Sequence, residues 1–177
     1  TLGQNIVVDN RPGAQGLIGA GEAMKSTPDG YTLFVGSTTT MAANLSLFKK
    51  LPYDPVKDFT PVARFITSPL MLVVRADFPA RNLSEFLAYA RTRQGQLSSG
   101  YAAAGMQVAL AELKTRGGIG VLEVPYKGVP QAVTDVLAGQ ITFTFADSAV
   151  AVTQAQGGKV RVLAVTGKTR TTLMPDI

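Results

Sequence analysis

The strongest constraint on the fold of this chain is the alternation of short apolar runs with segments whose apolar residues recur at helical spacing. Residues 70–74 and 141–145 are apolar runs of strand length, and residues 129–138 form a helical pattern that ends at Gly139. Strands separated by helices of this length are typical of βαβ units, in which a crossover helix joins parallel strands. The pattern therefore predicts an α/β fold with a parallel sheet.

The other expected elements continue this alternation along the chain. We predict further strands at residues 5–8, 31–35, 62–65, 98–101, 120–124 and 160–165. We predict further helices at residues 18–24, 36–48, 82–90, 106–114 and 149–156. Asn82 is expected to cap the helix that it begins, with Glu85 three residues further on.

The absence of Cys and His limits the chemistry more than any other feature of the composition. It excludes Cys-His nucleophilic pairs, Ser-His-Asp triads and zinc sites built from thiolates or imidazoles. The acidic residues mostly fall in expected turns or on helix surfaces, so they do not form the carboxylate pair of a glycosidase-like site. We therefore predict no enzymatic activity, no cofactor and no metal site.

The chain is mildly basic, with a formal net charge of +5. Proteins that bind nucleic acids usually cluster Lys and Arg on one face, whereas here these residues are scattered and no Trp is present. We predict no nucleic-acid partner and a modest preference for small anionic molecules.

Glycines follow the first expected strand, at positions 13, 16, 19 and 21. Their spacing differs from the G-x-G-x-x-G pattern of dinucleotide-binding loops. The turn either packs closely against its neighbours or presents a helix N-terminus to an anion. Gly13, Gln15 and Gly16 are included among the candidate ligand contacts.

Four consecutive hydroxyl side chains stand where the second expected strand gives way to a helix: Ser37, Thr38, Thr39 and Thr40. Hydroxyls beside free helix N–H groups can hold a carboxylate or phosphate. The alternative is simple helix capping, for which one hydroxyl suffices. These residues, together with Asn44, are candidate ligand contacts.

Three more strand-to-helix junctions carry small or polar residues, at positions 101–105, 125–128 and 146–148. In open α/β sheets, ligands bind outside the carboxyl ends of the strands. The junctions therefore predict a shared crevice whose candidate contacts are Tyr101, Ala102, Ala103, Gly105, Lys127, Gly128 and Asp147. Asp147 either accepts a hydrogen bond from a ligand hydroxyl or amine, or caps the following helix.

Several segments resemble the Bug-type solute receptors of tripartite tricarboxylate transporters. They include V-V-D-N-R-P-G-A-Q-G at residues 7–16, P-D-G-Y-T-L at 28–33, L-P-Y-D-P at 51–55, V-P-Y-K-G at 124–128 and D-V-L-A-G-Q at 135–140. The segments occur in the order of the family, and N-R-P-G-A and P-Y-K-G are the most specific of them.

The resemblance implies a two-lobed Venus-flytrap of the periplasmic-binding-protein type II class, located in the periplasm. Such a receptor captures a small carboxylate for a membrane transporter. We expect residues 1–72 to form a partial lobe 1, residues 73–165 to form lobe 2, and residues 166–177 to return toward lobe 1. The loops at 37–40 and 101–105 correspond to ligand-facing loops of the two lobes.

The sequence departs from the family pattern at several places. Val108 stands near a position where the family commonly has His, and the usual Phe-Asp pair reads Phe145-Ala146-Asp147. These changes predict a more apolar pocket, suited to an aromatic or otherwise apolar acid. The family pattern extends beyond both ends of the chain, so we expect a chain truncated at both ends.

Two other functions are compatible with the same residues. One is a sensing subunit that passes ligand occupancy to a regulatory protein. The other is a lyase that uses Lys127 with Asp147 on an acidic substrate, which requires a buried lysine with a lowered pKa.

Overall fold

The computed structural model describes residues 3–64, 66–67 and 69–177. The chain divides into two compact units, unit 1 at Thr1–Val62 and unit 2 at Ala63–Ile177. The lobe limits expected from the sequence, 1–72, 73–165 and 166–177, remain a prediction.

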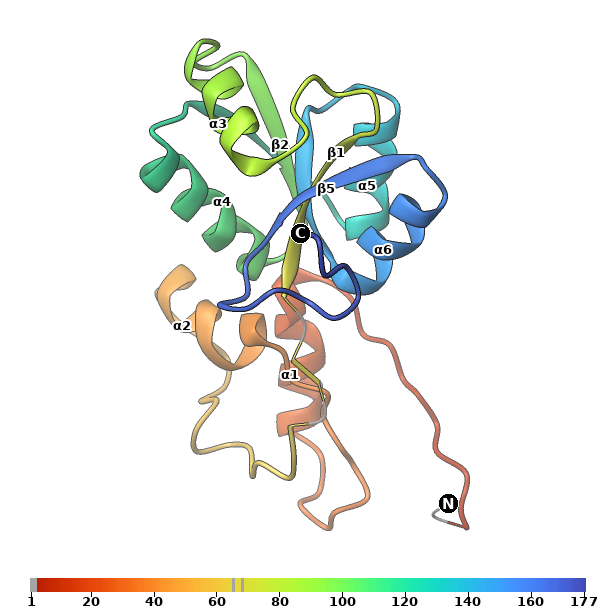
Figure 1. Ribbon diagram of the computed structural model, residues 1–177. Helices are drawn as coiled ribbons and strands as arrows, with labels where there is room; N and C mark the ends of the chain where they lie inside the picture. The colour runs from red at the N-terminus through yellow and green to blue at the C-terminus, as the bar shows by residue number, and fades with distance from the viewer. Residues whose placement is uncertain (1–2, 65, 68) are drawn as a thin grey trace. The chain divides into compact units, whose positions relative to one another are not determined.

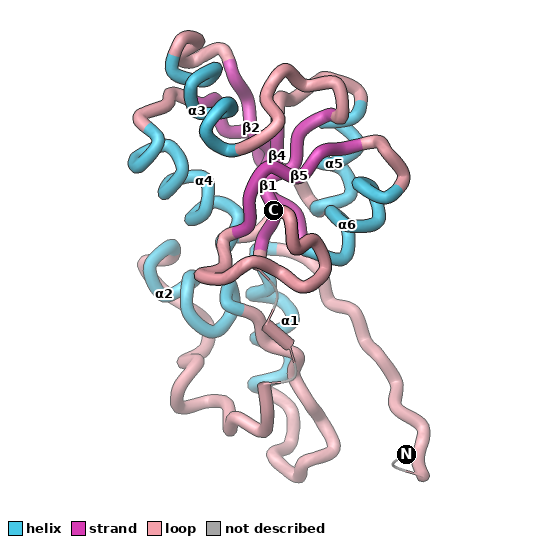
Figure 2. The backbone as a smooth tube through the Cα atoms, in the orientation of Figure 1, coloured by secondary structure: helices cyan, strands magenta, loops and turns pink. Residues whose placement is uncertain are grey.

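Unit 2 is built on a five-stranded sheet with the strand order β3-β2-β4-β1-β5 (Figures 1 and 2). Its elements follow one another as β1 (Leu70–Arg75), α3 (Leu83–Arg91), β2 (Leu97–Tyr101), α4 (Ala104–Gly117), β3 (Val121–Pro125), α5 (Val129–Leu137), β4 (Phe143–Asp147), α6 (Ser148–Gln156) and β5 (Val160–Val165). Each of these elements was predicted, with bounds that differ by a few residues.

The directions of the strands differ from the all-parallel expectation in one place. β2 runs parallel to β3 and β4, whereas β1 pairs antiparallel with both β4 and β5. Four strands therefore share one direction and β1 opposes them. The apolar run of β1 predicts a strand buried on both faces, but such a run has the same pattern whichever way its neighbours point.

Helices cover both faces of this sheet, with α3 and α4 on one side and α5 and α6 on the other (Figure 1). Side chains of β1 alternate between two apolar clusters. Leu72 and Val74 join the cluster that includes Phe86 and Leu110, whereas Met71 and Val73 join the cluster on the opposite face. Burial on both faces explains why β1 is apolar without interruption.

The predicted cap of α3 is confirmed. The side-chain oxygen of Asn82 accepts a hydrogen bond from the backbone N–H of Glu85 at 2.9 Å. The Glu85 carboxylate accepts in return from the backbone N–H of Arg81 at 2.7 Å. This arrangement satisfies two donors at the start of the helix and directs Phe86 into the core.

Unit 1 contains η1 (Ala14–Gly16), α1 (Leu17–Met24), the π-helical turn η2 (Thr39–Ala43) and α2 (Asn44–Leu47). The two helices expected in this part of the chain are therefore confirmed.

The three strands expected before β1 are not present among the described residues. Residues 5–8 and 31–35 form no strand, and residues 62–64 of the third segment form none either, while Phe65 lies outside the described residues. Val7 is 88% exposed and Tyr31 is 94% exposed. A strand needs a neighbour for its ladder hydrogen bonds, and none of the described segments of unit 1 supplies one.

Candidate functional site

The predicted ligand loops of unit 2 meet at one edge of its sheet. Tyr101 at the end of β2 pairs with Pro125 at the end of β3, and Asp147 at the end of β4 pairs with Leu70 at the start of β1. Because β2, β3 and β4 are parallel, the loops that follow them leave the sheet on the same side. The crevice expected at the carboxyl ends of the strands therefore has a shared edge in unit 2.

Three helices begin at this edge, directly after the strands. Their N-cap residues are Ala103 for α4, Gly128 for α5 and Asp147 for α6, and none of these side chains makes a capping hydrogen bond. The first N–H groups of a helix have no partner within the helix, and the helix dipole places positive charge there. The edge thus presents three electropositive helix ends to one region.

The side chains at this edge leave the backbone accessible. Ala102, Ala103 and Gly105 are small and half-buried, whereas Lys127 and Asp147 are exposed. The Asp147 carboxylate has no hydrogen bond or ion pair within the described chain, so it does not cap α6. Lys127 lacks the buried environment that the lyase alternative requires.

Sequence reasoning missed the residue that holds the 125–128 loop in place. The hydroxyl of Tyr126 donates to the Asp135 carboxylate at 2.6 Å, and its backbone N–H donates to the Tyr101 carbonyl at 2.8 Å. Burial, followed by the hydrogen bond and charge of Asp135, raises the pKa of Tyr126 to about 12. Only the tertiary structure brings Asp135, on α5, against this ring.

A groove of about 800 Å³ lies on the face covered by α3 and α4, and of the predicted ligand contacts Gly105 lines it. Gly105, at the start of α4, lines it together with Val108 one turn further on. Leu72 and Phe145 form part of its apolar lining, and Lys168 also lines it. Val108 thus lies among apolar side chains in this groove, whereas the more apolar ligand pocket stays a prediction.

The hydroxyl run of unit 1 divides into two pairs. Ser37 and Thr40 cap each other, because the Ser37 N–H donates to Thr40 Oγ1 at 2.9 Å and the Thr40 N–H donates to Ser37 Oγ at 3.4 Å. The side chains of Thr38 and Thr39 make no hydrogen bond within the described part of the chain. Capping therefore uses two of the four hydroxyls.

The glycine turn of unit 1 lies against this run. Its residues have left-handed backbone angles, with φ of 44° at Ala14, 54° at Gln15 and 82° at Gly16. A Cβ atom at Gly16 would lie 2.5 Å from the Thr40 methyl carbon. Only glycine fits there, so the packed-turn interpretation applies at Gly16. The turn is closed by a hydrogen bond from the Gly16 N–H to the Gly13 carbonyl at 2.9 Å.

Asn44 contacts the glycine turn and is 0% exposed. Its Nδ2 donates to the Gln15 carbonyl at 3.2 Å and to the Tyr53 hydroxyl at 3.4 Å, and that hydroxyl donates to the Thr40 carbonyl at 2.6 Å. The side-chain oxygens of Asn44 and Gln15 are buried and accept no hydrogen bond from the described residues. A ligand contact through Asn44 remains a prediction.

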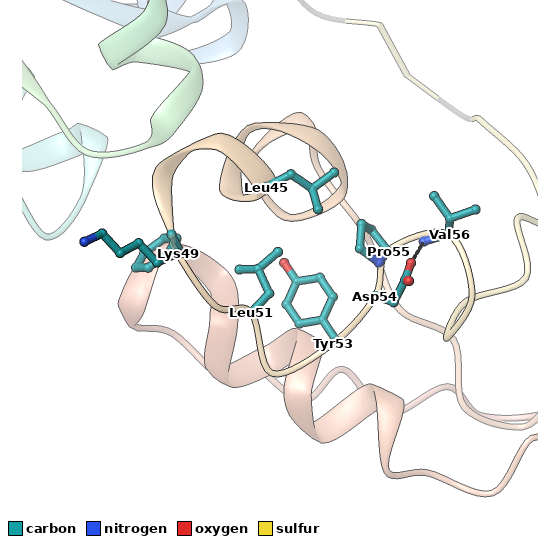
Figure 3. A pocket seen from close by; sticks show the side chains of 8 residues that line it. Leu45, Lys49, Leu51, Tyr53, Asp54, Pro55 and Val56 are labelled. Atoms are coloured by element: carbon teal, nitrogen blue, oxygen red, sulfur yellow. Dashed lines mark hydrogen bonds between the residues drawn. The ribbon is translucent and has the colours of Figure 1, made fainter.

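A smaller pocket of about 280 Å³ in unit 1 has Tyr53 in its lining (Figure 3). Leu45 and Val56 line it, and none of the predicted ligand contacts does. Asp54 in its wall accepts hydrogen bonds from the backbone N–H groups of Val56 and Lys57, which lower the pKa of its carboxyl group.

Two further features bear on the type of site. Within the described chain, no three carboxylates lie close enough together to hold a metal ion. No helix of the described chain is both long and apolar enough to cross a bilayer.

The chain is similar to proteins of one family along its whole length. The family model of the tripartite tricarboxylate transporter receptors matches residues 1–177. A protein from the tcbD–tcbE intergenic region of Pseudomonas sp. strain P51 is 35% identical, over 100% of this chain and 53% of its own length. The protein BugT of Bordetella pertussis is 34% identical, over 100% of this chain and 55% of its own length. The chain thus spans about half the length of these curated relatives.

Solved structures of similar proteins have the same fold. The structure of a periplasmic transporter has a TM-score of 0.93 at 38% identity, covering 99% of this chain and 60% of that protein. An R. palustris protein solved with adipate has a TM-score of 0.90 at 33% identity, covering 96% of this chain and 57% of that protein. MatC from Rhodopseudomonas palustris, with bound malate, has a TM-score of 0.87 at 33% identity, covering 99% of this chain and 60% of that protein.

These matches confirm the α/β fold class of the periplasmic-binding-protein type and the resemblance on which it was based. The chain belongs to the receptor family of the tripartite tricarboxylate transporters.

Proposed function

We propose that this chain is the ligand-binding part of a non-enzymatic receptor that captures a small carboxylate for a membrane transporter. The observation that carries the proposal is the edge of unit 2 where α4, α5 and α6 all begin. Helix N-termini bind anions through free N–H groups and through the positive end of the helix dipole. Three of them after adjacent strands favour a negatively charged group there.

The ligands of two relatives support the choice of a carboxylate. One similar structure was solved with adipate and another with malate. Both molecules are small dicarboxylates, which suit N–H and hydroxyl donors without a fixed positive charge. The candidate contacts from the sequence remain part of this proposal: Gly13, Gln15, Gly16, Ser37, Thr38, Thr39, Thr40, Asn44, Tyr101, Ala102, Ala103, Gly105, Lys127, Gly128 and Asp147.

Asp147 is proposed to select among these acids. A carboxylate next to an anionic ligand repels it, unless the ligand offers a donor to that carboxylate. The exposed Asp147 side chain has no partner within the described residues, so it is free to accept from a hydroxyl or ammonium group. Acids with such a group, for example malate, are therefore expected to bind better than acids without one.

Location and partner follow from the family. We propose that the protein works in the periplasm and that ligand-driven closure of two lobes is read by the membrane components of a transporter. The lobes are those predicted from the sequence, with residues 73–165 in lobe 2.

The proposal is tested by ligand-dependent thermal unfolding. The melting temperature is measured with malate, succinate, adipate and benzoate at about 10 mM, with succinamide as the neutral control. A ligand that binds only the folded state stabilises it in proportion to the logarithm of its concentration relative to Kd. At least one acid is expected to raise the melting temperature, whereas succinamide is not.

The variant Asp147→Asn tests the selection step. It is expected to reduce the preference for malate over succinate, because an amide no longer carries the charge that penalises acids without a donor. If none of the four acids raises the melting temperature of the unaltered chain, the receptor proposal is wrong. If acids bind but Asp147→Asn leaves their order unchanged, only the role of Asp147 is wrong.

A further inference from the structure

The two candidate ligand loops of unit 1 are joined by one chain of hydrogen bonds. We infer that Asn44 and Tyr53 are positioning residues, which hold the glycine turn at 13–16 and the hydroxyl turn at 37–40 in the conformation that meets the ligand. The expected effect on ligand binding rests on the proposed function, whereas the expected effect on the two turns does not.

The chain of hydrogen bonds runs through side chains that are distant in sequence. Asn44 Nδ2 donates to the Gln15 carbonyl at 3.2 Å and to the Tyr53 hydroxyl at 3.4 Å. Tyr53 in turn donates to the Thr40 carbonyl at 2.6 Å. The glycine turn is thus connected to the first turn of η2 by two side chains that both end on backbone carbonyls.

Burial makes these hydrogen bonds structurally important. Asn44 is 0% exposed and Tyr53 is 5% exposed, so water cannot replace a lost partner from the surface. A buried polar group without a partner costs more than a solvated one. Breaking one of these hydrogen bonds is therefore expected to move the turn that it holds, at residues 13–16 or 37–40, rather than to leave the geometry unchanged.

The backbone of the glycine turn needs such support. Ala14 and Gln15 both have positive φ, which residues with a Cβ atom rarely adopt, and their strain must be offset by the surrounding contacts. Asn44 holds the carbonyl of Gln15, one of these two residues. The tether therefore acts at the strained point of the turn.

Tyr53 is itself held rigidly by aromatic contacts. Its ring meets that of Phe59 edge-on at a centroid distance of 5.7 Å, and Phe59 packs against Phe34 at 5.4 Å. Aromatic pairs of this geometry stabilise a fixed ring orientation. The packing of its ring against Phe59 thus directs the Tyr53 hydroxyl at the Thr40 carbonyl.

These contacts separate positioning from ligand contact. Both side chains are buried and bond to the backbone of the loops, so their removal changes loop geometry whether or not Asn44 also contacts the ligand. Thr38 and Thr39, the hydroxyls that capping leaves unused, lie between the capping pair and depend on the orientation of the turn for their own direction.

The test uses Tyr53→Phe, Asn44→Leu and the double variant in the complete chain, with Tyr31→Phe as the matched control. Tyr31→Phe also removes one hydroxyl, but from a residue that is 94% exposed. Amide hydrogen exchange is measured without ligand. Exchange at residues 13–17 and 39–43 is expected to rise about tenfold or more, because each single variant loses two of the three hydrogen bonds.

The distribution of the effect distinguishes positioning from general stability. Residues 18–24 of α1 lie in the same unit and are expected to change much less than the two turns. The double variant is expected to show hydrogen exchange similar to that of either single variant, because each single variant already interrupts the same series of hydrogen bonds. A uniform rise across unit 1, or no rise at residues 13–17, would overturn the inference.

A binding measurement with malate adds the functional consequence. The single variants are expected to weaken malate binding about fivefold or more, because each loses two hydrogen bonds that hold the turns. Tyr31→Phe is expected to leave the Kd unchanged. If the unaltered chain binds none of the tested acids, the proposed function fails while hydrogen exchange still decides the positioning role. If malate binds and the Kd is unchanged in both variants despite faster exchange, the inference is wrong.

Discussion

Units 1 and 2 contain similar apolar segments but use them differently. In unit 2 the apolar runs pair into a sheet, and β1 and β4 are buried on both faces. In unit 1 the runs at residues 5–8 and 31–35 stay unpaired and largely exposed. The comparison teaches that an apolar run becomes a strand only where another strand satisfies its backbone.

The two units also position their candidate ligand loops by different means. In unit 2 the sheet register aligns the strand ends, and the loops follow from that alignment. In unit 1 the loops are held by side-chain tethers and by the close approach of Gly16 to Thr40. Unit 2 should therefore respond most to loss of apolar volume, and unit 1 to changes at a few polar or glycine positions.

The largest effect is expected from Phe143→Ala in unit 2. Phe143 is 0% exposed and its ring meets that of Phe86 edge-on at 5.1 Å. Removing the ring leaves a cavity, so the free energy of unfolding should fall by about 3–5 kcal/mol in urea titrations. Leu33→Ala in unit 1, at a side chain that is 70% exposed, should change it by less than about 0.5 kcal/mol. Equal losses would remove the contrast in packing between the units.

An intermediate effect is expected from Gly16→Ala in unit 1. The new Cβ atom would meet the Thr40 methyl carbon at 2.5 Å and would require a left-handed backbone. The variant should destabilise unit 1 by about 1–3 kcal/mol, measured as faster hydrogen exchange in α1 and η2.

Gly21→Ala is the control for that substitution. Gly21 lies within α1 and a Cβ atom there would meet nothing within 4 Å. Because alanine favours a helix, this variant should stabilise unit 1 by about 0.5–1 kcal/mol. A stabilising Gly16→Ala variant would contradict the close packing of the two turns.

The smallest effect is expected from Tyr126→Phe in unit 2, where a polar tether supplements the sheet. Loss of the hydrogen bond to Asp135 should lower the free energy of unfolding by about 1 kcal/mol near neutral pH. The pKa of Tyr126 is raised from 10.0 to about 12 in the folded chain. The folded state therefore keeps its proton where the unfolded state loses it, so this contribution is complete below pH 10 and is lost as pH rises toward 12.

The measurement is the difference in urea stability between the unaltered chain and Tyr126→Phe at several pH values. The difference should be constant up to about pH 9 and should shrink above pH 10. A difference that grows above pH 10 would show that the Tyr126 hydroxyl is not the donor to Asp135.

Much of unit 2 could be predicted because its signals are local. The cap formed by Asn82, the end of a helix at Gly139 and the apolar run of β4 each depend on neighbours in sequence. The strand-to-helix junctions at 101–105, 125–128 and 146–148 followed from the same alternation. Their convergence on one edge required only that the strands after which they come run parallel, and β2, β3 and β4 do.

Other features depend on contacts between residues far apart in the chain. The direction of β1 depends on its pairing with β4 and β5, which lie more than 60 residues further along. The Asn44 side chain donates to the Gln15 carbonyl, and the Tyr126 hydroxyl donates to the Asp135 carboxylate, at separations in sequence that carry no pattern.

By itself, the sequence determined the order and type of the elements of unit 2, the positions of the candidate ligand loops and the family. Backbone propensity, capping and apolar periodicity act over a few residues, so they can be read along the chain. Only the tertiary structure decided which apolar runs became strands, which way β1 runs and which buried side chains tether the loops. Each of these depends on whether a distant partner satisfies a backbone or polar group, because burial without such a partner is unfavourable.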